Sequence, residues 1–362
     1  MDRAKRDTTL VKPLTSVRFF AAMAVVIFHS GASFVRDTAH APGPVKTLLL
    51  NGYAGVTFFF VLSGFILHYT YQGSVTDAAS LKRYGIARFA RIYPVYLLAV
   101  LAMIPFIYFS GWGDLPQFFL LHWWPPAGTL PWTDWNMPSW TLSVEFFFYL
   151  CFPLLSALVL RLDRRMLLGL IVVLLAFSAV TASSSAISGT LAVFKWMRWI
   201  PIPILRLPEF LIGICAAELH LRRDDSRKFP VPAWLPAAAL VVGLCLTSSP
   251  RIATWATAMS VLMISAMVAD RGSLFTRVLA SRWLVLLGGA SYSLYLLHQP
   301  VHFGVVALLG KSKLMVALQY PILIALSVLV FLLFEEPVRE AIRKWTGMKP
   351  SAIEPVAAHP VG

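Results

Sequence analysis

Residues 16–30 read SVRFFAAMAVVIFHS and lie within an apolar run from about residue 14 to residue 35. At about 1.5 Å per residue in an α-helix, a run of this length crosses the roughly 30 Å of hydrocarbon in a bilayer. The run nevertheless contains two ionisable residues, Arg18 and His29. Because ionisable side chains are costly inside a membrane, we expect a transmembrane helix in which these two residues are functional or specially placed.

The whole chain has the composition of a membrane protein. Of its 362 residues, 58% are hydrophobic and 13% are charged, and the mean hydropathy is +0.72. Soluble domains are about 25% charged. We therefore expect an all-α fold, a polytopic transmembrane helical bundle of about ten helices. The expected spans are residues 14–35, 52–72, 92–110, 139–160, 166–182, 204–221, 231–249, 252–270, 286–309 and 314–335.

The basic residues are distributed unevenly between the connections. The net charge is +14, and 22 of the 31 lysines and arginines fall in segments on one side of the membrane, against 8 on the other. Since positively charged loops stay in the cytoplasm, we expect both termini there, and no nucleic-acid partner is needed to explain the charge. We expect a basic cytoplasmic segment (1–13), a transmembrane domain (14–340) and a disordered cytoplasmic tail (341–362).

Arg18 and His29 share one face of the first predicted helix. They are eleven residues apart, which at about 100° per residue is three turns plus about 20°, and about 16 Å along the axis. Arg18 lies about one turn from the cytoplasmic boundary, where snorkelling explains its charge as well as a function does. The short side chain of His29 reaches neither interface, so we interpret His29 as functional.

Two further arginines and one glutamate extend this set. Arg88 and Arg91 directly precede the predicted span 92–110, in RYGIARFARIYP. They are either positive flanks of a helix or, at the depth of Arg18, part of a phosphate-binding mouth. Glu145, in WTLSVEFFFYL, lies at the predicted depth of His29. It either orients that imidazole or forms a structural ion pair with another helix.

The span 286–309 and the longest outer connection carry weaker signals. Tyr295 and His298, in SYSLYLLHQP, are candidate contacts for an oxyanion or an acceptor. The connection 111–138 is rich in Trp and Pro and has no Lys or Arg, which is typical of an interfacial belt and also of a platform for sugar rings. No His or Cys spacing indicates a metal site.

Five of these stretches together resemble the acyltransferase-3 family. Members of this family are polytopic membrane proteins that acylate surface polysaccharides, lipopolysaccharides, antibiotics and similar acceptors. The matching stretches occur in family order along nearly the whole chain, and they are RFFAAMAVVIFH, GYAGVTFFFVLSGFIL, RFARIYP, WTLSVEFFFYL and SYSLYLLHQP.

The resemblance implies an O-acyltransferase, most simply an O-acetyltransferase, of the inner membrane. Acyl-CoA, usually acetyl-CoA, would be the donor from the cytoplasm rather than a tightly bound cofactor, and a saccharide or glycolipid hydroxyl would be the acceptor on the far side. The family motifs also imply that Arg18 and His29 are needed for activity.

We expect Arg18, Arg88 and Arg91 to bind the donor, and His29 and Glu145 to be catalytic. His29 would act either as general base or as a transient acyl carrier. The rival interpretation is a transporter or flippase for a polar lipid or saccharide, in which buried charges line a path. The broken helices in two matching halves that such a protein would show are not evident in the sequence.

Overall fold

A computed structural model describes residues 11–37, 43–109, 111–126, 134–181, 199–223, 229–247, 252–270, 272–310 and 312–347. Across these ranges the regular structure is helical, and one isolated bridge pairs Pro126 with Pro201. This confirms the predicted all-α fold.

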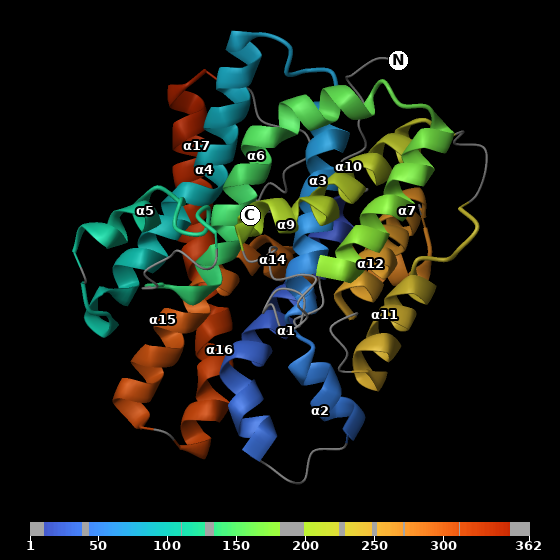
Figure 1. Cartoon of the computed structure of the whole chain (residues 1–362). Helices are drawn as coiled ribbons and strands as arrows, with labels where there is room; N and C mark the ends of the chain where they lie inside the picture. The colour runs from blue at the N-terminus through green and yellow to red at the C-terminus, as the bar shows by residue number, and fades with distance from the viewer. Residues whose placement is uncertain are drawn as a thin grey trace, which may run out of the picture.

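Figure 1 shows the arrangement of the helices. They are α1 (Val11–Asp37), α2 (Gly43–Leu50), α3 (Ala54–Tyr71), α4 (Ala78–Met103), α5 (Leu115–Phe118), α6 (Trp140–Val159), α7 (Arg164–Thr181), α9 (Ile202–Leu205), α10 (Leu207–Leu221), α11 (Trp234–Leu246), α12 (Ile252–Ala269), α13 (Leu274–Leu279), α14 (Arg282–Gly289), α15 (Ser291–Leu309), α16 (Lys313–Val330) and α17 (Glu336–Trp345).

Several of these helices are long and apolar enough to cross a membrane. Among the described residues there are 6 by length and composition: Lys12–Ser30, Ala54–Tyr71, Ala78–Phe106, Met137–Val159, Ile252–Ala269 and Leu314–Trp345. The other four predicted spans coincide with α7, α10, α11 and α15. The chain is therefore a multi-pass membrane protein, while the number of ten spans and the cytoplasmic termini stay predictions.

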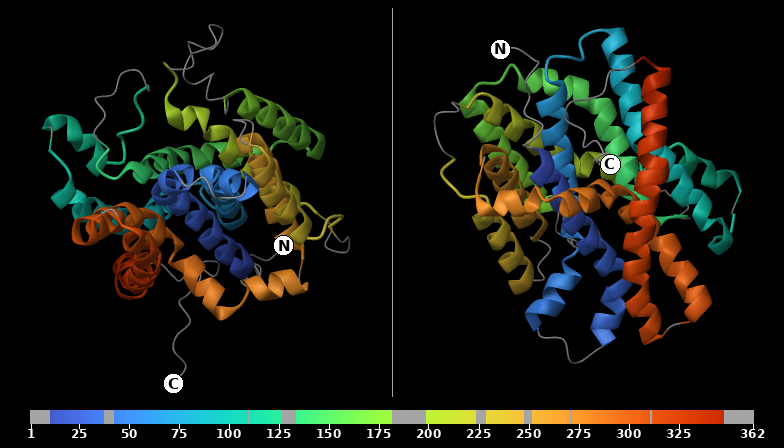
Figure 2. Two further views of the ribbon diagram at one scale, coloured as in Figure 1. Left: turned by 90° about the horizontal axis from the view of Figure 1, so that it is seen from below. Right: turned by 180° about the vertical axis from the view of Figure 1, so that it is seen from behind.

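Helices α1 and α3 occupy the centre of the molecule, as the view from below in Figure 2 shows. Helix α3 packs closely against α10 through a reciprocal pair of glycines. A Cβ atom on Gly64 would lie 2.0 Å from the Phe210 carbonyl oxygen, and one on Gly213 would lie 2.1 Å from that of Val61. Small residues at a transmembrane interface let two backbones touch in this way.

The predicted span 286–309 is not one helix. Helix α14 ends at Gly289 and lies across the bundle, and α15 starts anew at Ser291 (Figure 2). The reason is a close crossing with α1, because a Cβ atom on Gly288 would lie 2.0 Å from the Thr15 carbonyl oxygen. This break places the first turn of α15 beside α1 and α4, where the Tyr292 hydroxyl donates to the Ile92 carbonyl at 2.6 Å.

The last long helix continues beyond the predicted span 314–335. Helices α16 and α17 form one column (Figure 2), joined by a π-helical turn at Phe331–Glu335. Helical structure thus extends to Trp345, into the segment predicted as a tail. Residues 348–362 of that tail and residues 1–10 of the predicted N-terminal segment lie outside the described residues.

Candidate functional site

A cavity of about 150 Å³ lies between α1, α3, α4, α6, α15 and α17. Its charged lining consists of four arginines and one carboxylate, that of Glu145. An excess of guanidinium groups in an otherwise apolar bundle fits an anionic ligand. The polar and charged lining residues are Thr15, Arg18, Ser63, Thr70, Tyr71, Arg88, Arg91, Thr141, Glu145, Tyr149, Ser291, Tyr292, Tyr295 and Arg339.

The structure brings together the three arginines predicted to bind a donor. Arg18 comes from α1, whereas Arg88 and Arg91 come from the middle of α4. The Nε atom of Arg18 is buried and has no hydrogen-bond partner among the described residues. Arg18 therefore keeps donor capacity for a ligand in the cavity.

Aromatic rings hold the guanidinium of Arg88 in place. Its Nη2 donates to the Tyr71 hydroxyl at 3.2 Å. Its Cζ lies 5.4 Å from the centre of the Tyr71 ring and 5.7 Å from that of Tyr149. Cation–π contacts on two rings orient the guanidinium.

Arg91 is held by a carboxylate that sequence reasoning missed. Its Nη1 forms an ion pair with Glu335, the last residue of the π-helical turn. The other oxygen of Glu335 accepts from Ser293 Oγ at 2.7 Å, and the Arg91 guanidinium lies over the Tyr292 ring at 5.2 Å. The signal in the sequence was an acidic residue at the end of the last apolar run.

The fourth arginine of the lining, Arg339, was also missed. It is 2% exposed and pairs with Glu336 within the first turn of α17. Its sequence position suggested only one more cytoplasmic positive charge. In the folded chain, the side chain of Arg339 lines the cavity.

Glu145 does not pair with His29, contrary to one of the two expectations. Its Oε1 accepts from Ser63 Oγ at 3.0 Å and from the Tyr149 hydroxyl at 2.6 Å. In the described part of the chain, no hydrogen bond or ion pair joins Glu145 to His29. The reason is that α6 turns Glu145 towards α3 and the cavity, where Arg18 is its electrostatic neighbour.

The partner of His29 is instead a second histidine. The rings of His29 and His298 are stacked, with centroids 5.2 Å apart and an interplanar angle of 18°. His298 is buried, its Nδ1 lies 2.6 Å from the Tyr295 carbonyl oxygen, and its Nε2 has no partner among the described residues. The short Nδ1 contact indicates that this nitrogen carries the proton and donates it to the carbonyl.

His29 itself does not line the cavity. Tyr295 does, and its ring centroid lies 6.0 Å from that of His298. The Tyr295 hydroxyl donates to the Pro138 carbonyl at 3.2 Å and lies 3.1 Å from Thr141 Oγ1, another lining atom. A chain of ring contacts thus runs from one end of the cavity through Tyr295 and His298 to His29.

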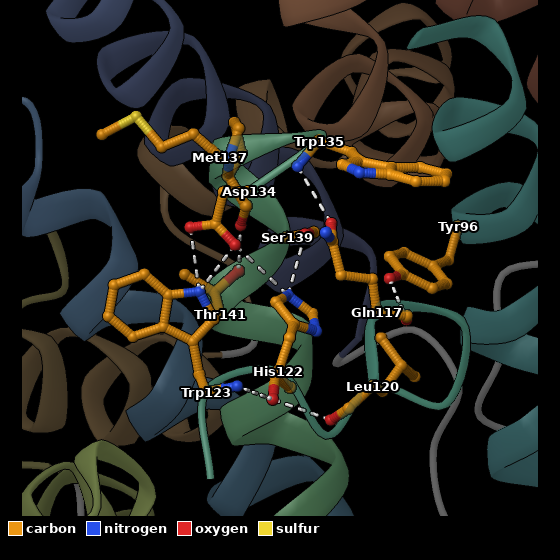
Figure 3. A network of polar contacts seen from close by, with 12 residues as sticks. Tyr96, Gln117, Leu120, His122, Trp123, Asp134, Trp135, Met137, Ser139 and Thr141 are labelled. Carbon is orange, nitrogen blue, oxygen red and sulfur yellow. Dashed lines mark hydrogen bonds and ion pairs between the residues drawn. The ribbon is translucent and has the colours of Figure 1, made fainter. Parts of the chain in front are cut away.

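The connection before α6 supports this end of the cavity (Figure 3). His122 Nε2 lies 3.1 Å from Ser139 Oγ, and the Asp134 carboxylate accepts from Trp123 Nε1 at 3.0 Å. Burial lowers the pKa of His122 to about 4 and raises the pKa of Asp134 to about 6. Both groups are therefore mostly uncharged near pH 5.

The same connection is also tied to α15. Pro300 has no N–H, which leaves the Leu296 carbonyl without its helical donor. Asn136 Nδ2, fully buried, donates to that carbonyl at 3.0 Å. The predicted roles of this connection as an interfacial belt or a sugar platform stay predictions. Among the described residues, no group of three or more His, Cys, Asp or Glu side chains is placed to hold a metal ion.

Comparison with known proteins identifies the family. The family model described as an acyltransferase domain, acyltransferase-3, matches residues 14–336. The chain is 34% identical over 311 residues to acyltransferase MdmB of Streptomyces mycarofaciens, covering 79% of this chain and 77% of that protein. It is 24% identical to the O-acetyltransferase OatA of Staphylococcus aureus, covering 80% of this chain and 50% of the relative.

A similar partial match joins the chain to the peptidoglycan O-acetyltransferase OatA of Listeria monocytogenes, with 26% identity over 50% of this chain and 30% of the relative. The chain thus matches half or less of the length of these two OatA proteins. No solved structure matches. With the family model covering most of the chain and MdmB similar over most of both lengths, the chain belongs to the acyltransferase-3 family and is a multi-pass membrane O-acyltransferase.

Proposed function

We propose that the chain transfers an acyl group, most simply acetyl, from cytoplasmic acyl-CoA to a hydroxyl of an extracytoplasmic saccharide or glycolipid. The observation that carries this proposal is the cavity lined by four arginines and one carboxylate. The positive-inside rule puts the start of α4 and the end of α17 at the cytoplasmic face of the inner membrane. The similarity to a peptidoglycan O-acetyltransferase supports the class of acceptor.

Arg18, Arg88 and Arg91 bind the diphosphate of the donor. Guanidinium forks match phosphate oxygens, and all three arginines face one cavity. The pantetheine arm then points along α1 towards His29, which lies about 16 Å from Arg18 by helix rise. This separation is comparable to the reach of the arm.

His29 acts on the acceptor hydroxyl. As general base it takes the hydroxyl proton while the oxygen attacks the thioester carbonyl, so that an O–C bond forms and the C–S bond breaks. The proton then passes to the thiolate, and the products are an O-acyl ester and CoA. In the alternative route, a nitrogen of His29 attacks the thioester carbonyl, the C–S bond breaks and CoA leaves as the thiol with the imidazole proton. The acceptor oxygen then attacks the acyl-imidazole, the N–C bond breaks and the hydroxyl proton returns to His29.

We assign Glu145 to the donor side of the site. It is an electrostatic neighbour of Arg18 and accepts from two hydroxyls, which supports a role in positioning that arginine rather than the imidazole of His29. We assign the positioning of His29 to His298 and Tyr295. The ring of His298 contacts the ring of His29 on one side and the ring of Tyr295 on the other. Tyr295 has to move aside for the thioester to reach His29.

The test uses the purified full chain in lipid nanodiscs with acetyl-CoA and a soluble saccharide acceptor. Acceptor-dependent release of free thiol is expected, together with an acetylated product by mass spectrometry. His29→Ala should abolish the transfer and leave CoA binding intact. A transporter would release no thiol, and wild-type turnover by His29→Ala would refute the role of His29.

A further inference from the structure

Arg339 is a buried charge whose partners do not use all of its hydrogen-bond donors. It is 2% exposed, and its Nη2 pairs with Glu336. Its Nε atom is buried without a hydrogen-bond partner among the described residues, and the side chain lines the cavity. A buried guanidinium N–H without an acceptor is costly, and an oxygen atom of a ligand in the cavity would supply that acceptor.

The position of Arg339 extends the row of donor-binding arginines. Arg91 is an electrostatic neighbour of both Arg18 and Arg339, and Arg339 is a neighbour of Arg343. Arg339 and Arg343 are four residues apart on α17 and therefore share a face. Arg343 is half-buried and lies near Arg88. The row thus runs from Arg18 on α1 to the last turn of α17.

At the π-helical turn before α17, two consecutive carboxylates pair with two different arginines of this row. The Glu336 N–H bonds to the Phe331 carbonyl, five residues earlier, instead of four. Glu335 pairs with Arg91, and Glu336 pairs with Arg339. Each arginine therefore has its own carboxylate and a fixed orientation, and π-helical turns of this kind occur frequently at functional sites.

We infer that Arg339 and Arg343 form a subsite for the ribose 3′-phosphate of CoA, which rests on acyl-CoA as the proposed donor. That phosphate is at the end of CoA opposite the thioester. Helix α17 lies at the end of the bundle opposite the C-terminal half of α1, the half that contains His29 (Figure 1). Two guanidiniums on one helix face suit a phosphate monoester.

The test compares acetyl-CoA with acetyl-3′-dephospho-CoA on the purified full chain in nanodiscs. For the wild type, the KM for the dephospho donor should be about 10- to 100-fold higher, the range for charge-assisted hydrogen bonds. In Arg339→Gln the KM for acetyl-CoA should rise until it nearly equals the KM for acetyl-3′-dephospho-CoA. The matched control Arg83→Gln, exposed on α4, should keep the wild-type ratio.

Two results would overturn the inference. One is a wild type that uses both donors equally well, and the other is an Arg339→Gln variant that loses activity on both donors by the same factor. Since Arg339→Gln leaves Glu336 buried without its partner, the double variant Glu336→Gln with Arg339→Gln is measured too, with the same expectation. A wild type that uses neither donor refutes the proposed donor itself, which is a distinct outcome.

Discussion

The imidazole rings of His29 and His298 are stacked 5.2 Å apart and join α1 to α15. His298 is held by its bond to the Tyr295 carbonyl oxygen, so it presents a fixed ring face to His29. Two imidazolium charges at this distance would repel each other, which favours at most one proton on the pair. The residue proposed to do the chemistry is thus positioned by a ring and not by a carboxylate.

Removal of the second imidazole tests this relationship. His298→Ala should lower kcat for acyl transfer about 10- to 100-fold, because a base that loses its fixed orientation loses much of its general-base contribution. The KM for acetyl-CoA should change less than about threefold, since His298 does not line the cavity. His302→Ala is the matched control, because His302 bonds to Gln319 on α16 at 2.9 Å. Equal losses in both variants would contradict the prediction.

The donor-binding role of α4 can be separated from the chemistry. Arg91→Ala should weaken CoA binding by about 10-fold or more, as expected for a lost charge-assisted contact. His29→Ala should leave CoA binding unchanged, because His29 lies outside the cavity lining. Isothermal titration calorimetry with CoA measures both constants. Loss of binding in His29→Ala alone would reverse the assignment.

Glu145→Gln distinguishes the two possible partners of this carboxylate. The amide oxygen still accepts hydrogen bonds from Ser63 and Tyr149, so the fold should be preserved. If Glu145 acts on Arg18, the KM for acetyl-CoA changes and the pH profile of kcat keeps its midpoint. A midpoint shifted by about one pH unit would instead mean that Glu145 interacts directly with the imidazole of His29.

Tyr295→Phe should loosen one end of the cavity. The variant loses the hydroxyl contacts to Thr141 and to the Pro138 carbonyl, together worth about 2 kcal/mol, or about 30-fold in an opening equilibrium. Water should then reach the thioester more often, and hydrolysis of acetyl-CoA without acceptor should rise by about 10-fold or more, measured as free thiol. Tyr96→Phe is the control, since its hydroxyl bonds to the Gln117 carbonyl in the connection. An unchanged hydrolysis rate in Tyr295→Phe would argue against closure by this residue.

Acid should change the stability of the connection before α6 in opposite directions in two variants. Asp134, with a folded pKa of about 6, binds more protons in the folded state below pH 6, so its contribution to stability rises as pH falls. His122, with a folded pKa of about 4, stays neutral where the unfolded chain is protonated, so its contribution falls as pH drops below about 6.5. The two effects largely offset each other in the wild type.

Single substitutions expose each contribution. Between pH 7.5 and pH 5, Asp134→Asn should reduce the local stability of the connection by about 2 kcal/mol, because His122 alone remains. His122→Gln should increase it by about 1.4 kcal/mol, because Asp134 alone remains. Hydrogen exchange of residues 111–126 at the two pH values, corrected for intrinsic rates, measures the change. The same sign in both variants would contradict the prediction.

The sequence by itself determined the class of protein and part of the site. Hydropathy and the five ordered motifs depend on residues close together in the chain, and they were sufficient for an all-α membrane acyltransferase. The grouping of Arg18, Arg88 and Arg91 was also predictable, because the positive-inside rule placed all three at one depth. The depth of a residue in the membrane follows from its distance to the end of its apolar run, which can be counted in the sequence.

Only the tertiary structure decided which side chains meet at a given depth. His29 and Glu145 were assigned similar depths, yet α6 turns Glu145 to Ser63 and α1 turns His29 to His298. The rotation of each helix about its axis and the break between α14 and α15 set these pairings. Both depend on close backbone packing between residues distant in the chain, such as Gly288 against α1, and this packing also brings Glu335 and Arg339 into the site.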